Sequence, residues 1–399
     1  MTEPTSTFGR RLRAHRERVG LTRPVLGGLV GRSAEWVKAI EGGRLLPPRL
    51  PMLLRLAEVL DITDLADLTG SQPLPVASVT RAGHPDVDRV AAAMKRTTHP
   101  AGDPTTAVVL RGLVDQAWTL WHRSSTERGA VAAVLPHLLD NARMSARRLD
   151  GTDRRAALVE LARVYHLAQL YAADQPYPEL VWLAADRAMA AAQDADNPDA
   201  IAAAAWYYAH VYRASNQTDA AEQVLVDAAA LLDPAAGGEQ LARWGQAQLG
   251  IALAHSKRGR SGQAWRAWDA ADEAANRLGG GYVHPWLMFG PAACAAYGVT
   301  VEIDLVRPGE AIRRATHTDY SSLPSRTRRA THLVDAARAH MMRGEDVAVV
   351  HLLGRALRES VDTVRHRPHA RMAIMELAGR RGTVGEDARE LALAIGLDG

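Results

Sequence analysis

Residues 21–44, LTRPVLGGLVGRSAEWVKAIEGGR, carry the pattern of two short helices joined by a tight turn. Thr22 is placed to accept hydrogen bonds from the free N–H groups that open the first helix. Gly31 suits the left-handed backbone at which a helix ends. Ser33 is a favourable N-cap for the second helix, and Glu35 lies in its first turn, where the helix dipole favours an anion.

The side chains of this stretch separate into inner and outer faces. Leu26, Leu29 and Val30 are expected to form the apolar face of the first helix, and Val37 and Ile40, three residues apart, that of the second. The residues left facing outward on the second helix are Ala34, Glu35, Lys38 and Ala39. A polar helix exposed after a tight turn is the layout of a DNA-reading helix-turn-helix.

With its flanks, this stretch resembles the Xre/Cro/C1-type repressor domain over residues 7–69. The resemblance rests on the spaced pattern Gly20-Leu21-Thr22, Leu26, Gly31, Ser33, Val37, Ile40-Glu41 and Gly43-Arg44, with an amphipathic helix before it and the helix 53–60 after it. It implies a five-helix, lambda-repressor-like DNA-binding domain at residues 1–70. Gly27 departs from the family, which prefers alanine there.

The same resemblance implies roles for individual residues. Ala34, Glu35, Lys38 and Ala39 match base-facing positions, and Arg23, Arg44 and Arg49 match positions that contact phosphate. Arg16 and Glu41 match an internal ion pair that ties the first helix to the recognition helix. The resemblance further implies a homodimer that binds an inverted repeat in double-stranded DNA.

Charge is concentrated at the amino end. The 399-residue chain is formally +3, but residues 1–55 hold 11 Arg/Lys against 4 Asp/Glu, a net of +7. Residues 56–70 hold four acids and no base, and residues 71–399 hold 37 charges of each sign. A localised positive field attracts phosphate independently of sequence. The neutral remainder favours a ligand or partner module.

The composition argues against several other classes. Apolar residues make up 47% of the chain, but no run of about 20 of them suggests a membrane span, and the amino end lacks a secretory apolar segment, so we expect a cytoplasmic protein. Cys294 is the single cysteine, and no pattern for a nucleophile, metal or cofactor is present. The sequence therefore predicts neither an enzyme nor a metal or cofactor site. We interpret the basic run RHRPHARM, residues 365–372, as a solvated helix start.

Beyond the first domain we predict a linker and then helices only. Residues 71–85 contain three prolines and no helical period. From residue 86 to 399 helical segments follow one another, so the fold class is all-α. A period of 40–44 residues is visible in the alanines expected on the second helix of each pair: Ala146, Ala188, Ala228, Ala271, Ala315 and Ala356. Such a period predicts an α-solenoid.

Within pairs the pattern resembles degenerate tetratricopeptide repeats, for example at Tyr208-Ala209, Tyr212, Ala221, Leu225 and Ala228. In a curved solenoid the first helix of each pair lines the concave side. The residues expected in that groove, as a candidate effector site, are Arg163, His166, Trp206, His210, Arg213, Gln246 and Ser256. Their mixture of aromatic, cationic and amide groups suits a peptide or a small molecule.

Together these features predict a sequence-specific transcriptional regulator in which residues 86–399 sense an effector and support dimerisation. The alternative is an interaction scaffold, whose solenoid recruits partner proteins and whose N-terminal domain is a docking module. The positive charge of residues 1–55 favours the regulator.

Overall fold

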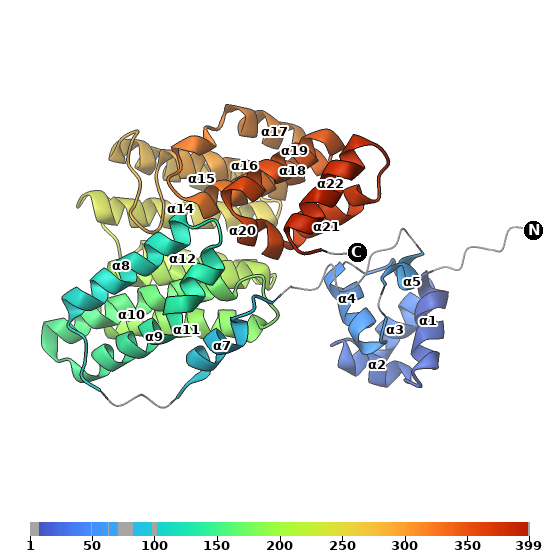
Figure 1. The fold of residues 1–399 in the computed structure, drawn as a ribbon, viewed down its shortest axis with the longest axis horizontal. Coiled ribbons are helices and arrows are strands. Elements are labelled where there is room, and N and C mark those ends of the chain that lie inside the picture. The colour runs from blue at the N-terminus through green and yellow to red at the C-terminus, as the bar shows by residue number, and fades with distance from the viewer. Residues whose placement is uncertain (1–7, 49, 63, 71–82, 98–101, 398–399) are drawn as a thin grey trace, which may run out of the picture. The chain divides into compact units, whose positions relative to one another are not determined.

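The computed structural model describes residues 8–48, 50–62, 64–70, 83–97 and 102–397, and it divides the chain into two units, residues 1–82 and 83–399 (Figure 1). Every regular element in the described ranges is a helix, which confirms the all-α prediction. No helix there is long and apolar enough to cross a bilayer. Most of the predicted linker, residues 71–82, lies outside the described residues.

Unit 1 is a small five-helix domain. Its helices are α1 (Phe8–Arg18), α2 (Arg23–Leu29), α3 (Ala34–Glu41), α4 (Leu50–Val59) and α5 (Ala66–Thr69). Its core draws on every helix, and the largest fully buried side chains in it are those of Leu12, Leu26, Leu56, Leu60, Leu65 and Leu68. The core of unit 1 therefore covers the apolar face of α3 and does not cover the opposite face of that helix.

Unit 2 consists of helix pairs. Its elements are α7 (Val87–Lys95), α8 (Ala107–Arg123), α9 (Glu127–Arg148), α10 (Gly151–Ala172), α11 (Pro178–Asp194), α12 (Pro198–Ala214), α13 (Thr218–Ala229), α14 (Gly238–Lys257), α15 (Ser261–Leu278), α16 (Pro291–Asp304), α17 (Pro308–His317), η1 (Tyr320–Ser322), α18 (Arg326–Met341), α19 (Asp346–Glu359), α20 (Val361–His366), α21 (Pro368–Ala378) and α22 (Thr383–Ala394). Six successive pairs run from α8/α9 to α18/α19. The unit is repeat-like, as the alanine period predicts.

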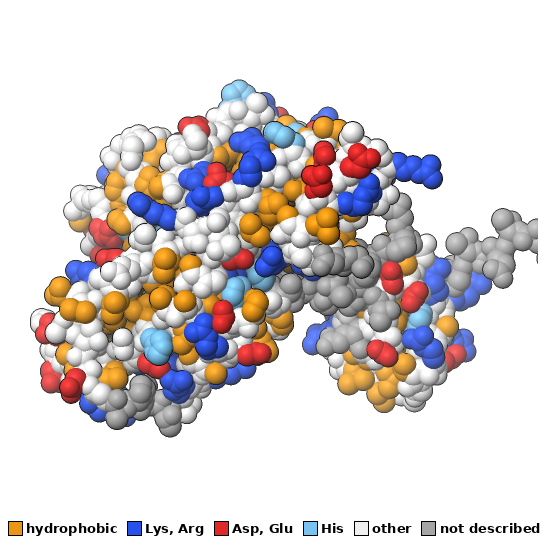
Figure 2. Space-filling model, viewed as in Figure 1, with side chains coloured by type: hydrophobic (Ala, Val, Ile, Leu, Met, Phe, Trp, Pro, Cys, Tyr) orange, Lys and Arg blue, Asp and Glu red, His pale blue; other side chains and the backbone are white. Residues whose placement is uncertain are grey.

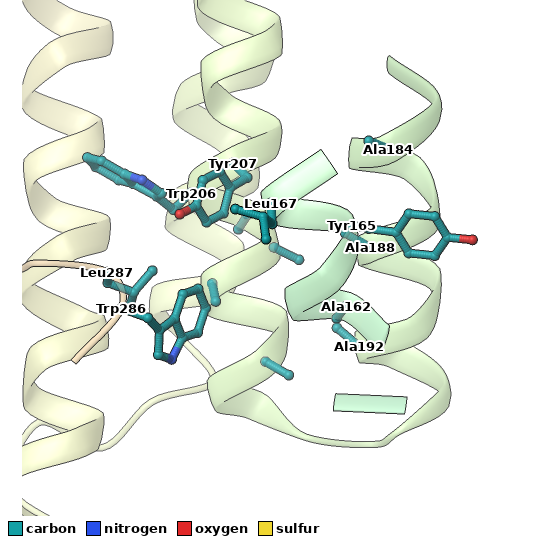
Figure 3. Packing of buried hydrophobic residues seen from close by; sticks show 14 of the residues in the cluster. Ala162, Tyr165, Leu167, Ala184, Ala188, Ala192, Trp206, Tyr207, Trp286 and Leu287 are labelled. Carbon is teal, nitrogen blue, oxygen red and sulfur yellow. The ribbon is translucent and has the colours of Figure 1, made fainter. Parts of the chain in front are cut away.

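The periodic alanines lie where the period places them, one in the second helix of each pair. Five of the six are buried, and Ala315 is half-buried. Small side chains let neighbouring helices approach closely. On α11, for example, Ala184, Ala188 and Ala192 recur every four residues and are fully buried, in the cluster that also holds Ala162 of α10 (Figure 3).

The row of pairs closes on itself. The first helices of the pairs, which we call the inner helices, contact one another in the order α8, α10, α12, α14, α16 and α18, and α18 also packs against α8. Hydrogen bonds join the two ends: His122 Nδ1 lies 2.8 Å from Ser325 Oγ, and the Val361 amide donates to the Ser125 carbonyl at 3.0 Å. We call this contact between α8–α9 and α18–α20 the seam.

The closed ring corrects the expected open groove. Its inside is filled by side chains of the inner helices and by the segment 279–290, which connects α15 to α16. Trp286 and Leu287 of this segment belong to the same buried cluster as Trp206 and Tyr207 of α12 (Figure 3). A concave face that would be open in a superhelix is therefore packed here, except for discrete cavities.

Candidate nucleic-acid interface

The turn before α3 is built largely as predicted. Gly31 adopts φ +69°, and the Arg32 amide donates to the Gly27 carbonyl at 2.7 Å. Ser33 Oγ caps α3 by accepting from the Trp36 amide at 3.1 Å. Thr22 has N-cap geometry, but its side chain accepts no capping hydrogen bond, so that expectation is wrong. One side-chain cap and one left-handed glycine therefore set the direction of α3.

The two faces of α3 are clearly separated. Val37 and Ile40 are buried, whereas Glu35 and Lys38 are exposed and lie 3.7 Å apart at their charged atoms. Ala34 and Ala39, the other predicted base-facing residues, are half-buried on the same helix. The helix thus presents two charged side chains beside two small apolar ones, the combination of groups that base edges can contact.

A buried carboxylate fixes α3 from behind. Glu41 receives a hydrogen bond from Arg16 Nε at 2.5 Å and another from Arg23 Nε at 2.7 Å. Burial alone would raise the pKa of Glu41, but the hydrogen bonds from these two arginines outweigh it and hold the pKa below its ordinary value. Arg16 and Glu41 therefore occupy the positions that the family resemblance gives them, with Arg23 as a second partner.

The arginines predicted to contact phosphate differ in their solvent exposure and in the contacts that they already make. Arg44 is exposed directly after α3. The side chain of Arg23 is 37% exposed, so it can still reach outward while it holds Glu41. Arg49 lies outside the described residues.

The departure at Gly27 has a packing reason. A Cβ at this position would lie 2.7 Å from the Arg32 carbonyl oxygen, closer than van der Waals contact allows.

Leu29, which was expected on the apolar face of α2, is instead 54% exposed, because the core of unit 1 takes Leu26 and Val30 from this part of the chain. The turn after α2 therefore folds back more tightly than sequence periodicity suggests.

The seven residues proposed for an effector groove all lie on inner helices, on α10, α12 and α14. None of them faces open solvent: His210 is half-buried and the other six are buried. Ser256 donates to the Leu253 carbonyl of its own helix, and Trp206 and Gln246 line a narrow, mostly apolar cavity. Because the ring is closed, the residues that were expected to line an open groove lie in its interior instead.

Arg163 and His166 border a larger cavity of about 180 Å³ between α10, α12 and α14. Trp286 stacks on His166, and the guanidinium groups of Arg163 and Arg243 lie 5.1 and 4.9 Å from the Trp286 ring. Within the described chain neither ring nitrogen of His166 has a hydrogen-bond partner. A cavity of roughly 150 Å³ can hold a benzene-sized molecule. Sequence reasoning missed Trp286, because no periodic signal joins segment 279–290 to α10, and it also missed Arg243 of α14.

The lone cysteine is buried, and so is part of the basic run 365–372. Burial raises the pKa of the Cys294 thiol far above its ordinary value. No group of three or more potential metal ligands occurs in the ranges that the structure describes. The run 365–372 is not a solvated helix start, since His366 and Arg371 are buried and Arg367 is half-buried at the seam.

The comparisons with known proteins agree with the geometry of unit 1. A family model described as a helix-turn-helix domain matches residues 7–68. No curated protein matches the chain. Among solved structures, the crystal structure of BtubC (BKLC) from P. vanneervenii aligns with 13% identity and a TM-score of 0.38, over 63% of this chain and 92% of that one. At that level the alignment carries no argument about function. The chain therefore contains an N-terminal helix-turn-helix domain, a class that binds DNA.

Proposed function

We propose that this protein is a cytoplasmic transcription regulator of the Xre/Cro/C1 type, a binding protein and not an enzyme, which recognises a specific DNA sequence through α3. The observation that carries the proposal is the presentation of α3. Its polar face is exposed, its apolar face is buried, and Glu41 is clamped by Arg16 and Arg23. The charge of +7 over residues 1–55 supplies the attraction to phosphate.

Base reading follows from the chemistry of the exposed face. Lys38 donates to the guanine acceptors O6 and N7, Glu35 accepts from cytosine N4, and Ala34 contacts a thymine methyl group. The exposed contact between Glu35 and Lys38 costs little to open, since solvent screens such pairs. Arg44 fixes the register through phosphate. A homodimer would place two copies of α3 about 34 Å apart on an inverted repeat.

We further propose that unit 2, a ring of tetratricopeptide-like pairs, binds a small-molecule or peptide effector and supports dimerisation. The cavity that Arg163, His166 and Trp286 border supports this role, because polar groups in it are buried and incompletely paired. On the face drawn in Figure 2, acidic and basic side chains of unit 2 are interspersed, in keeping with the neutrality of residues 71–399. An effector acts by binding one arrangement of the dimer better than another.

Selection of DNA from a random library by the full-length protein tests the proposal. We expect one enriched palindromic sequence, and binding that weakens steeply as salt is added. Lys38→Ala should relax the preference at one base pair and weaken specific binding about tenfold or more. Arg313→Ala, which removes one exposed charge in unit 2, is the matched control and should leave the preference intact. Absence of any enriched sequence would refute the proposal.

A further inference from the structure

A second polar cavity lies at the seam of the ring. Its volume is about 70 Å³, enough for about five water molecules at roughly 10–15 Å³ of such volume each. It is lined by residues from five helices or their ends: Trp121, Arg128, Leu170, Ala173, Asp174, Thr327, Arg328, Thr331, Thr363 and Arg367. Three arginines and three threonines thus converge on a space that holds a group of about five heavy atoms.

Arg128 is the best-defined group in this cavity. Its side chain is only 6% exposed, and its Nη1 lies 3.7 Å from Glu127 Oε1, the carboxylate behind the cavity wall. One Nη donates to the Ala173 carbonyl at 3.0 Å, and the guanidinium group lies 5.7 Å from the Trp121 ring. Its Nε is buried and has no hydrogen-bond partner among the described residues. A buried N–H of a guanidinium without an acceptor is costly, so this donor calls for an acceptor atom from a molecule bound in the cavity.

The other two arginines are held at the cavity wall by neutral or distant groups. Arg328 donates to the Tyr297 hydroxyl at 2.6 Å, and Arg367 Nη2 lies 3.4 Å from the Thr331 hydroxyl. The carboxylate nearest to Arg367 is that of Asp174, at 3.8 Å from Nε. Donor capacity of both guanidinium groups therefore remains for a ligand.

Positive charge prevails in the lining. Asp174 is the single carboxylate that lines the cavity as described, against three guanidinium groups. Two further carboxylates stand behind the wall and are already engaged. Glu127 accepts from Ser360 and Thr363, and burial raises its pKa, while Asp362 accepts from the Arg128 amide at 2.9 Å. The residues that line the cavity thus carry more positive than negative charge, with Glu127 and Asp362 offsetting part of it from behind the wall.

We propose that this cavity binds the phosphoryl group of a small molecule. Several guanidinium and hydroxyl donors arrive from different helices, which suits a compact anion with acceptor oxygens on all sides better than a planar carboxylate. The inference rests on the proposed function in that the bound molecule would be an effector, held in a second cavity separate from the one that Arg163, His166 and Trp286 border. It goes further in naming the chemical class and a site that sequence reasoning did not include.

The position of the cavity gives the ligand something to regulate. Arg128 belongs to the first helix pair and Arg328 to the last, so one anion held by both strengthens the seam. Ala173 and Asp174 precede Gln175, whose Oε1 accepts from the His84 amide at 2.8 Å. His84 lies where the chain enters unit 2, directly after residues 71–82. The wall of the cavity is therefore joined through Gln175 to residue 84, at the start of unit 2.

Calorimetric titration of the full-length protein with inorganic phosphate tests the site. We expect saturable binding of phosphate and of sulfate, with acetate and chloride inert at matched ionic strength. Arg367→Gln, at a half-exposed position, should weaken phosphate binding at least tenfold while the circular dichroism spectrum is unchanged. Thr331→Val should weaken it by a smaller factor, and Arg313→Gln, with the same loss of charge elsewhere, should have no effect.

Three outcomes would overturn the site, and two of them are phosphate binding no stronger than that of chloride and equal affinity in Arg367→Gln and in the unaltered protein. Preferential binding of acetate would also overturn it, since it would assign a carboxylate ligand. A protein that binds phosphate but selects no DNA refutes the proposed function and keeps the anion site. A protein that selects a DNA sequence but does not bind phosphate refutes the anion site and keeps the proposed function.

Discussion

The two units differ in how completely the polar groups behind their candidate sites are paired. In unit 1 the buried carboxylate of Glu41 is paired with two arginines. In unit 2 the described residues leave many buried polar atoms without partners, among them both ring nitrogens of His166 and of His332 and the indole nitrogen of Trp206. The carboxylate behind α3 is therefore fully paired, whereas several polar groups around the cavities of unit 2 have no partner among the described residues.

This difference matches a division of labour. A reading helix must keep one geometry while its outer face meets DNA, and a fully paired charge network behind it serves that need. A sensing region must gain stability when a ligand arrives, which requires donors and acceptors that the empty protein does not satisfy. Three measurements on the unliganded protein test this difference between the two units.

As the pH falls, the free energy of unfolding should decrease for unit 2 before it decreases for unit 1. Burial, helped by the charge of Arg328, lowers the pKa of His122 and His332 to about 3, from an ordinary value of 6.5. Because the unfolded chain takes up these protons first, their contribution is complete above pH 6.5 and declines as the pH falls toward 3. The lowered pKa of Glu41 preserves its contribution until the pH falls below about 4.5.

Between pH 6.5 and 5 we therefore expect unit 2 to lose up to about 2 kcal/mol per histidine, and unit 1 to lose little. Amide hydrogen exchange, corrected for the intrinsic pH dependence, measures both units in one sample. Equal losses in α3 and α18 would contradict the comparison.

Removal of one partner of the buried network should destabilise unit 1 strongly. Arg16→Ala leaves the carboxylate of Glu41, whose side chain is 2% exposed, with Arg23 alone, and we expect a loss of about 3 kcal/mol. Arg13→Ala is the control on the same helix, because its ion pair with Glu17 is exposed and should matter little. Amide hydrogen exchange in α1–α3 measures the loss of stability in both variants. Equal losses in Arg16→Ala and Arg13→Ala would show that the buried network does not stabilise unit 1.

The adjacent glycines of α2 should respond with opposite signs. Gly27→Ala forces a Cβ to within 2.7 Å of the Arg32 carbonyl oxygen, so we expect a loss of about 1–2 kcal/mol despite the better helix propensity of alanine. Gly28→Ala meets no atom within 4 Å and should gain up to about 1 kcal/mol. Urea unfolding of the two variants decides the point, and a gain from both would remove the packing explanation for the departure from the family pattern.

Much of unit 1 could be predicted because its signals are local. The Ser33 cap, the turn at Gly31 and the inward positions of Val37 and Ile40 depend on neighbours within a few residues. In unit 2 the alanine period located the second helix of each pair for the same reason. Leu29 and Thr22 were misjudged because the core and the turn of unit 1 decided their surroundings.

The sequence by itself determined the helices, their pairing and the concentration of positive charge at the amino end, since periodicity, capping and composition act over short distances along the chain. Long-range packing alone closes the pairs into a ring, brings Trp286 against Arg163 and Arg243, and makes Arg128, Arg328 and Arg367 line one cavity at the seam. These contacts join residues up to 239 positions apart. Their existence depends on the angle by which each pair turns relative to the one before, a quantity that accumulates over six pairs and leaves no periodic trace in the sequence.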